Sequence, residues 1–469
     1  MLGMRVLLAL AISGVVSLAA CGDDGDAPPD ALGGDLLDRL NALPGVTAEE
    51  RSTSTPGYTY IRLAITQPVD HDDPDGPTFV QHVSLLHKDT RAPMVVQTSG
   101  YWDYYRDFPV ELTRLLAANQ ISIEHRFFGA SRPEPADWSK LTIEQMAHDQ
   151  HAIIAALRTI YDGAFVTTGG SKGGMTAVYH RRFFPDDVEA TVPYVAPLSF
   201  GAPDPRYEAF LDTIGPAACR QGIRDLAVEL LSNRRAAMEQ RTRDDATAQG
   251  HAYTRIAVGP AVESSIASLE WAFWQYYGVG LCQQLPPTTA SDEDLWQFLS
   301  TVSPPSDNSD ASIDAFEPYY YQAYAQLGFP DTGGDYLAPH VEYGDEDYVG
   351  ALPPVVPTYD GGAAMQDIDQ WVRTDGAQLL FVYGEWDPWT GGQFELGDAR
   401  DSLRLTVAQG SHAAQIGGLA SADREAALGR LAAWTGVTPT PAAARAREIA
   451  IAPPVVRVPP AMLRALRAR

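Results

Sequence analysis

Residues 164–176 (AFVTTGGSKGGMT) contain a serine between glycines, the pattern G-x-S-x-G at Gly169, Ser171 and Gly173. A β-rich run precedes the serine and a helical pattern follows it, which is the strand–turn–helix context in which this pattern carries a nucleophile. Glycines permit the sharp turn, because side chains there would clash with the neighbouring strand and helix. The sequence therefore predicts that the Ser171 hydroxyl stands above the end of a strand, with helix N–H groups facing a developing oxyanion.

A serine nucleophile needs a general base, and the base needs a carboxylate that orients it. Asp387 and His412 each follow an apolar run that reads as a buried strand, and His412 is the only histidine after Asp387. The order Ser, Asp, His is the order found in α/β-hydrolases. We therefore predict a triad of Ser171, Asp387 and His412. Asp398 and Asp401 are weaker alternatives for the acid.

The second donor of such an oxyanion hole usually follows the third strand. Here that strand ends in residues 97–102 (QTSGYW), so we expect the backbone N–H of Tyr101 to act together with that of Lys172. A buried turn without a catalytic part is the alternative. The Lys172 side chain leaves the turn in another direction from its neighbour Ser171, so we do not expect a Ser–Lys mechanism.

Short apolar runs alternate with helical patterns around these residues, as in a parallel α/β sheet covered on both faces. Residues 199–355 instead contain helical patterns and no comparable buried strand. The predicted fold is thus an α/β-hydrolase with a core at 37–198 and 356–435 and an inserted helical cap at 199–355. The expected strands are 58–66 and 79–87, an antiparallel pair, then 93–98, 121–124, 164–168, 191–196, 378–384 and 403–408. The expected helices are 142–160, 174–184, 364–375 and 421–434 in the core, and 205–213, 219–241, 261–277, 293–302 and 312–326 in the cap.

The N-terminus reads as an export signal. A positive charge precedes an apolar run that is short for a membrane span, and the run ends in Leu-Ala-Ala-Cys at residues 18–21. This resembles a bacterial lipobox. We expect a signal peptide at 1–20 and lipidation of Cys21, which would anchor the exported protein at the cell envelope, on the outer membrane or cell surface. A plain signal peptide is the alternative. Residues 21–36 read as a flexible linker, and 436–469 as a basic, proline-rich tail, either packed on the acidic body or solvated.

The chain has 469 residues, with 34 basic and 60 acidic side chains and a net charge of −26. Such a charge repels phosphate backbones, so we expect no nucleic-acid partner. After export, Cys219 and Cys282 would form a disulfide by default, with two free thiols as the alternative. His148 and His151 lie three residues apart on an expected helix without a third ligand, so we expect a solvated face, no metal and no cofactor.

Several segments resemble secreted bacterial prolyl tri/tetrapeptidyl aminopeptidases, serine peptidases related to prolylcarboxypeptidase and dipeptidyl peptidase II. The segments are 169–176 (GGSKGGMT), 179–185 (YHRRFFP), 124–129 (EHRFFG) and 384–389 (GEWDPW). The resemblance implies the same triad, an α/β-hydrolase fold and a helical cap. It also implies that short peptides are released from a free N-terminus, with proline favoured before the scissile bond.

An aminopeptidase needs an acid for the substrate ammonium and flat apolar walls for proline. The lysosomal relatives carry Gly-Asn-Glu after the third strand, whereas residues 100–103 here read GYWD, so the acid must come from elsewhere. We expect Trp389 and Trp102 at the substrate, although aromatic residues can equally be cap core. Glu124 can also belong to an ion-pair knot with His125 and Arg126. The candidate acids, among which the sequence does not decide, are Glu124, Asp103, Glu385 and a cap glutamate.

Two other functions fit the same residues. The triad could act on an acyl ester or lipid instead of a peptide, which a membrane anchor would suit. The chain could also be a non-catalytic surface lipoprotein on a hydrolase scaffold, although the intact Ser, Asp and His in order disfavour this.

Overall fold

A computed structural model describes residues 33–103, 106–330 and 334–440. The expected signal peptide at 1–20, Cys21 and residues 441–469 of the tail lie outside the described residues. None of the described helices is both long enough and apolar enough to cross a membrane.

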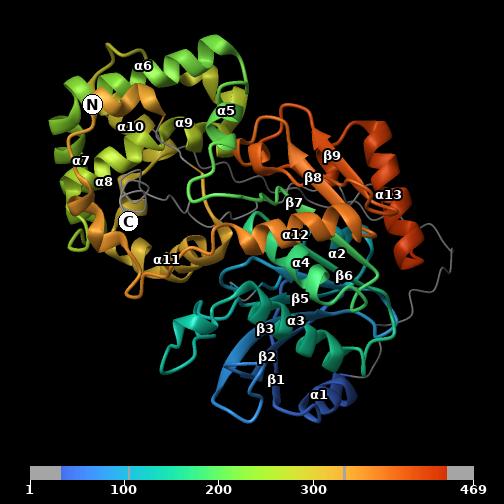
Figure 1. Cartoon of the computed structure of the whole chain (residues 1–469). Coiled ribbons are helices and arrows are strands. Elements are labelled where there is room, and N and C mark those ends of the chain that lie inside the picture. Colours follow the sequence, from blue (N-terminus) through green and yellow to red (C-terminus); the bar gives the residue numbers. More distant parts are fainter. Residues whose placement is uncertain (1–32, 104–105, 331–333, 441–469) are drawn as a thin grey trace, which may run out of the picture.

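The described core is built on one nine-stranded sheet (Figure 1). The strand order is β1-β2-β3-β5-β4-β6-β7-β8-β9. From β1 to β5 neighbouring strands are antiparallel, and from β5 to β9 they are parallel, so the carboxyl ends of the parallel strands meet at one edge. The strands are β1 (Val46–Arg51), β2 (Thr59–Pro68), β3 (Thr78–His87), β4 (Met94–Thr98), β5 (Asn119–Ile123), β6 (Phe165–Gly170), β7 (Ala190–Tyr194), β8 (Leu380–Gly384) and β9 (Leu403–Val407).

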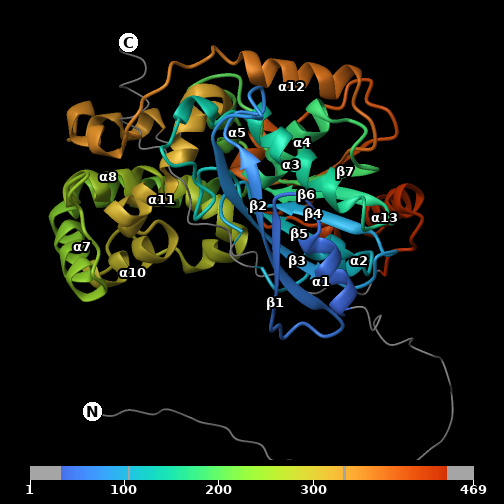
Figure 2. The same ribbon diagram turned by 90° about the horizontal axis from the view of Figure 1, so that it is seen from below.

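Helices cover both faces of the sheet, because successive side chains of each buried strand point to opposite faces. In β4, Val96 packs in the cluster that holds α3, whereas Val95 packs in the cluster that holds α2. In β8, Phe381 and Tyr383 face the α4 and α12 side. One face thus carries α1 (Gly33–Asn41), α3 (Ile143–Leu157), α4 (Lys172–Phe183) and α12 (Ala363–Thr374), and the other α2 (Glu111–Leu115) and α13 (Ser421–Thr435) (Figure 2).

A helical cap lies between β7 and α12 and has a core of its own, which includes Trp271, Trp274 and Leu226. It rests on the carboxyl edge of the sheet, where α5 packs against the short helix η8 (Pro388–Gly392). The cap elements are α5 (Arg206–Leu211), α6 (Ala217–Asn233), α7 (Arg235–Gln249), α8 (Val258–Ala267), α9 (Leu269–Ala272), η2 (Phe273–Tyr277), η3 (Gly278–Gln284), α10 (Asp292–Val302), η4 (Pro305–Asn308), α11 (Asp310–Gln322), η5 (Ala323–Leu327), η6 (Asp335–His340) and η7 (Asp345–Ala351).

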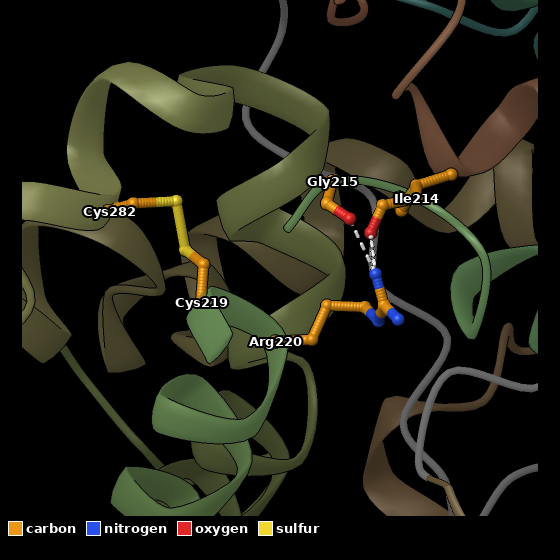
Figure 3. The surroundings of a disulfide bond; sticks show 5 residues. All are labelled: Ile214, Gly215, Cys219, Arg220 and Cys282. Atoms are coloured by element: carbon orange, nitrogen blue, oxygen red, sulfur yellow. Dashed lines mark hydrogen bonds between the residues drawn. A yellow bond between two sulfur atoms is a disulfide. The ribbon is translucent and has the colours of Figure 1, made fainter. Parts of the chain in front are cut away.

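A disulfide joins Cys219 of α6 to Cys282 of η3 within the cap (Figure 3). Next to it, Arg220 donates from Nη1 to the carbonyl oxygens of Ile214 and Gly215 at 2.5 and 2.6 Å. The cross-link and the arginine thus hold the start of α6 against both the 3-10 segment and the loop before it.

Among the described strands and α-helices, three were not predicted. Helix α1 begins at Gly33, inside the expected linker at 21–36, and its Leu36 is buried against the sheet, so the linker boundary is corrected. The surrounding Gly, Asp and Pro residues concealed its short apolar repeat. Strand β1 is a mostly exposed edge strand, and α2 has only five residues. Three expected cap helices are divided: 219–241 breaks at Arg234, 261–277 becomes α8, α9 and the π-helical η2, and 312–326 becomes α11 and the π-helical η5.

Candidate active site

Ser171 sits on a strained turn between β6 and α4. Its φ of 56° and ψ of −126° place a non-glycine residue in a backbone region that costs free energy and is found mainly at functional sites. The turn is held because Ser171 N donates to Tyr194 O at 2.9 Å and Ser171 O accepts from Met175 N at 3.0 Å. The Ser171 side chain is half-buried.

The glycines of the motif allow β4, β6 and α4 to approach closely. A Cβ on Gly173 would lie 2.1 Å from Thr98 O, and one on Gly169 would lie 2.4 Å from the same oxygen. Gly170, in contrast, has nothing within 4 Å of such an atom. The two glycines of the G-x-S-x-G pattern are therefore required by packing, and the glycine between them is not.

Asp387 and His412 meet above β8 and β9. His412 Nδ1 lies 2.7 Å from Asp387 Oδ2, with the carboxylate fully buried and the imidazole 6% exposed. A carboxylate only accepts hydrogen bonds, so this contact places a proton on Nδ1 and leaves Nε2 as the acceptor of a neutral ring. Asp387 also caps η8, accepting from Trp389 N at 3.1 Å. Asp401, by comparison, binds Arg430 and Trp434 on α13.

The free face of the imidazole lies at the same sheet edge as Ser171. Among the described residues, the buried His412 Nε2 has no hydrogen-bond partner, so a bond from Ser171 Oγ is not formed in this structure. Serine–histidine bonds of this kind often tighten only when substrate is present. Because β6, β7, β8 and β9 are parallel neighbours, their carboxyl ends bring Ser171, Asp387 and His412 to one rim.

The two expected oxyanion donors are placed differently. The Lys172 N–H lies in the first turn of α4, where backbone N–H groups have no partner within the helix. The Tyr101 N–H, however, donates to Ser99 Oγ at 3.0 Å. Tyr101 can therefore serve an oxyanion only after leaving this acceptor, a competition that the sequence analysis missed.

The candidate acids differ in availability. Glu124 is committed to its own loop, because Oε1 accepts from Ala130 N, Ser131 N and Ser131 Oγ while Oε2 accepts from Asp103 N. Burial raises the pKa of Asp103 to about 7, although Ser84 Oγ donates to its carboxyl. Glu385 is exposed, with Oε2 2.6 Å from Gln409 N. The buried cap glutamates Glu263 and Glu270 are paired with Arg235 and Arg224.

The candidate aromatic walls lie at two separate places. The Trp389 ring lies 6.2 Å from that of His412 and edge-on to Trp271 at 5.1 Å, so it borders the base. Trp102 packs against Phe128 of the core and Phe316 of α11 at 5.4 and 5.1 Å, so it connects the core to the cap. Gln275 of η2 was not among the predicted site residues. Its backbone carbonyl accepts a hydrogen bond from His412 N at 2.9 Å and so links the cap to the loop that carries His412.

The buried ion pair of Arg126 is formed with Asp149 and not with Glu124. Arg126 binds both carboxylate oxygens of Asp149 at 2.7 Å, and neither side chain is exposed. His151 is hydrogen-bonded to Asp187, and the His148 ring stacks on that of His71. Both histidines therefore contact other side chains and do not only face solvent, as was expected. Within the described ranges, no group of three or more His, Cys, Asp or Glu side chains is arranged to hold a metal ion.

A family model described as PS-10 peptidase S37 matches residues 27–456. The chain belongs to the peptidase S37 family. It is 39% identical over 411 residues to the prolyl tri/tetrapeptidyl aminopeptidase of Streptomyces mobaraensis, which covers 86% of each chain. This S37 chain is therefore a peptidase whose α/β-hydrolase sheet carries a serine, a histidine and an aspartate at one rim.

Two solved structures with a similar fold are only distantly similar to the S37 chain. Proline iminopeptidase of Mycobacterium smegmatis is 12% identical, with 74% of this chain and 91% of that chain covered and a TM-score of 0.33. The peroxisomal α/β-hydrolase Lpx1 of Saccharomyces cerevisiae is 11% identical, with 88% and 97% covered and a TM-score of 0.35. At these scores the likenesses add nothing to the topology described above.

Proposed function

We propose that this S37 peptidase is a serine exopeptidase that releases tri- and tetrapeptides from free N-termini, with proline favoured before the scissile bond. The observation that carries the proposal is the buried Asp387–His412 hydrogen bond, which leaves Nε2 free at the rim that holds Ser171. The relative from Streptomyces, named for this activity, supports the substrate class.

The reaction has two steps, acylation of Ser171 and hydrolysis of the acyl-enzyme. His412 Nε2 takes the proton of Ser171 Oγ as the oxygen attacks the scissile carbonyl, and Asp387 stabilises the imidazolium. The Lys172 N–H faces the oxyanion. His412 then gives its proton to the leaving amine, and an acyl-enzyme forms. In the second step His412 activates a water molecule that releases the short peptide and restores Ser171.

The cap supports an exopeptidase more than an open-cleft endopeptidase. It lies over the carboxyl edge of the sheet and is bonded to the His412 loop through Gln275. A lid in this place restricts entry to chain ends. Trp389, with Trp271 and Tyr207 edge-on to it, offers the flat apolar surface that a proline ring packs against.

The activity is tested with an Ala-Ala-Pro chromogenic amide and a fluorophosphonate probe. We expect wild-type turnover and labelling, and loss of both in Ser171→Ala with the fold retained. Ser300→Ala, at a half-buried serine of the cap helix α10, is the matched control. Equal cleavage of N-acetylated and free peptides would reject the aminopeptidase specificity, and faster cleavage of acyl esters with no amide turnover would indicate an esterase.

We also propose that the S37 chain is exported and anchored through a lipid on Cys21. The lipobox-like residues 18–21 support this. The eleven residues between Cys21 and α1 span at most about 40 Å, so the body would stay close to the envelope. Radiolabelled palmitate should enter the wild type and not Cys21→Ala, which should appear in the medium or periplasm. Labelling of Cys21→Ala would contradict the anchor.

A further inference from the structure

The Lys172 side chain is buried beside the nucleophile turn without an acid. It is 2% exposed, and its Nζ donates to Gly100 O at 2.6 Å. The Tyr101 and Phe128 rings flank the Nζ at 5.2 and 5.3 Å. Burial lowers the pKa of Lys172 well below its usual value, and no ion pair to it is found in the described part of the chain. A buried lysine without a counter-charge is costly to fold, so the position calls for a reason other than stability.

Among the described residues, the one hydrogen-bond acceptor of the Lys172 Nζ belongs to the peptide group of an expected oxyanion donor. Gly100 O and Tyr101 N–H are the two ends of one peptide unit, and in a trans peptide they point in opposite directions. Holding the carbonyl oxygen toward Lys172 therefore directs the Tyr101 N–H away from it. There the N–H meets Ser99 Oγ at 3.0 Å, and this hydroxyl donates onward to Trp102 O at 2.5 Å.

The same loop is packed directly on the start of α4. Gly100 has a φ of +77°, and a Cβ there would lie 2.8 Å from the backbone carbon of Lys172 and 2.9 Å from Gly173 N. The two expected oxyanion donors are thus part of one packed unit. Lys172 supplies one N–H from its own backbone and fixes the peptide that carries the other through its side chain.

We propose that Lys172 is a positioning residue for the oxyanion hole. Its Nζ holds the Gly100–Tyr101 peptide so that the Tyr101 N–H can exchange Ser99 Oγ for the oxyanion of the tetrahedral intermediate. This role rests on the proposed function, because it assumes acyl transfer at Ser171. It differs from a Ser–Lys mechanism, in which Nζ would bind the serine hydroxyl instead of a carbonyl oxygen.

The test replaces Lys172 by methionine, which has a similar length and no N–H donor. We expect kcat on the Ala-Ala-Pro amide to fall about 10- to 100-fold with KM within about threefold. The Tyr101 N–H would stabilise the negative charge that develops in the transition state, and it would contribute little to binding of the uncharged substrate carbonyl. The affinity for a peptide aldehyde, which forms a tetrahedral adduct, should fall in parallel, whereas binding of the product Ala-Ala-Pro should not change. Lys88→Met is the matched control, because Lys88 also lies over a tyrosine ring, that of Tyr58, at 5.7 Å.

Other outcomes separate this proposal from the proposed function. If the wild type turns over no amide, the substrate class fails, but the rate of fluorophosphonate labelling still tests the hole, because that reaction also builds an oxyanion. Unchanged kcat and labelling rate in Lys172→Met would overturn the positioning role, as would a rise in KM alone.

Ser99→Ala tests the same peptide without touching the lysine, and decides the matter if Lys172→Met does not fold. Removing the competing acceptor should tighten binding of the peptide aldehyde about 2- to 10-fold, the worth of one hydrogen bond. Unchanged affinity would show that the Tyr101 N–H does not serve the oxyanion and would overturn the proposal.

Discussion

His412 Nδ1 lies 2.7 Å from Asp387 Oδ2, and this hydrogen bond joins the loops that follow the last two strands of the sheet. The carboxylate is fully buried, so its charge is felt by the imidazole with little screening by water. The contact fixes the tautomer of His412 and the direction of Nε2. It therefore decides whether a base is ready at the rim.

Replacing Asp387 by asparagine should remove the base without disturbing the fold. The amide would donate to Nδ1, so Nε2 would carry the proton and could not accept one from Ser171. We expect kcat/KM to fall about 10³- to 10⁴-fold, measured by initial rates at neutral pH. Asp401→Asn is the control, since Asp401 binds Arg430 and Trp434 instead. A tenfold loss or less in Asp387→Asn would argue against the triad.

The glycines around Ser171 offer a matched pair of substitutions. Gly173→Ala would push a methyl group to 2.1 Å from Thr98 O, so β4 and α4 must move apart, whereas Gly170→Ala meets nothing within 4 Å. We expect Gly173→Ala to lose about 1–3 kcal/mol of unfolding free energy and most of its fluorophosphonate labelling. Gly170→Ala should keep both. Urea unfolding and probe labelling measure the two effects, and equal behaviour of the two variants would contradict this packing account.

The disulfide should stabilise the cap through the unfolded chain. Cys219 and Cys282 are 63 residues apart, and closing such a loop removes about 4 kcal/mol of unfolded-state entropy. The double variant Cys219→Ser/Cys282→Ser should therefore lose stability of this order in urea unfolding. Dithiothreitol should lower the stability of the wild type to the same level and leave the double variant unchanged. If reductant added to the unfolded wild type left its stability in urea unfolding unchanged, the disulfide would not contribute to stability.

Asp103 should make stability depend on pH. Burial raises its pKa to about 7 in the folded protein, against about 3.9 in an unfolded chain. Between these values the folded state holds a proton that the unfolded state has lost, so stability falls as the pH rises from about 4 to 7. Asp103→Asn should remove this loss, which is of the order of 4 kcal/mol for three pH units. Urea unfolding at pH 4.5 and 8 measures it, and the exposed Asp75→Asn should keep the wild-type profile.

Some elements of the fold could be predicted from the sequence and others could not. The parallel strands and α3, α4, α12 and α13 appear as patterned runs, because a buried strand and an amphipathic helix leave local signals. Edge strand β1 and the five-residue helix α2 have too little apolar pattern to be predicted, and the short apolar repeat of α1 lies among Gly, Asp and Pro residues that read as a linker. No proline or glycine lies at the break at Arg234 within 219–241, so the sequence does not indicate that the helix is interrupted there.

The sequence by itself determined which side chains could do the chemistry, since Gly169, Ser171 and Gly173 form a local motif and Asp387 and His412 follow it in the required order. Only the tertiary structure decided their partners. It turned Asp401 toward α13, committed Glu124 to its own loop, and gave Lys172 a carbonyl oxygen instead of an acid. Motifs depend on backbone geometry over a few residues, whereas these partners come from segments tens to hundreds of positions away, whose side chains meet only when the sheet and cap have packed.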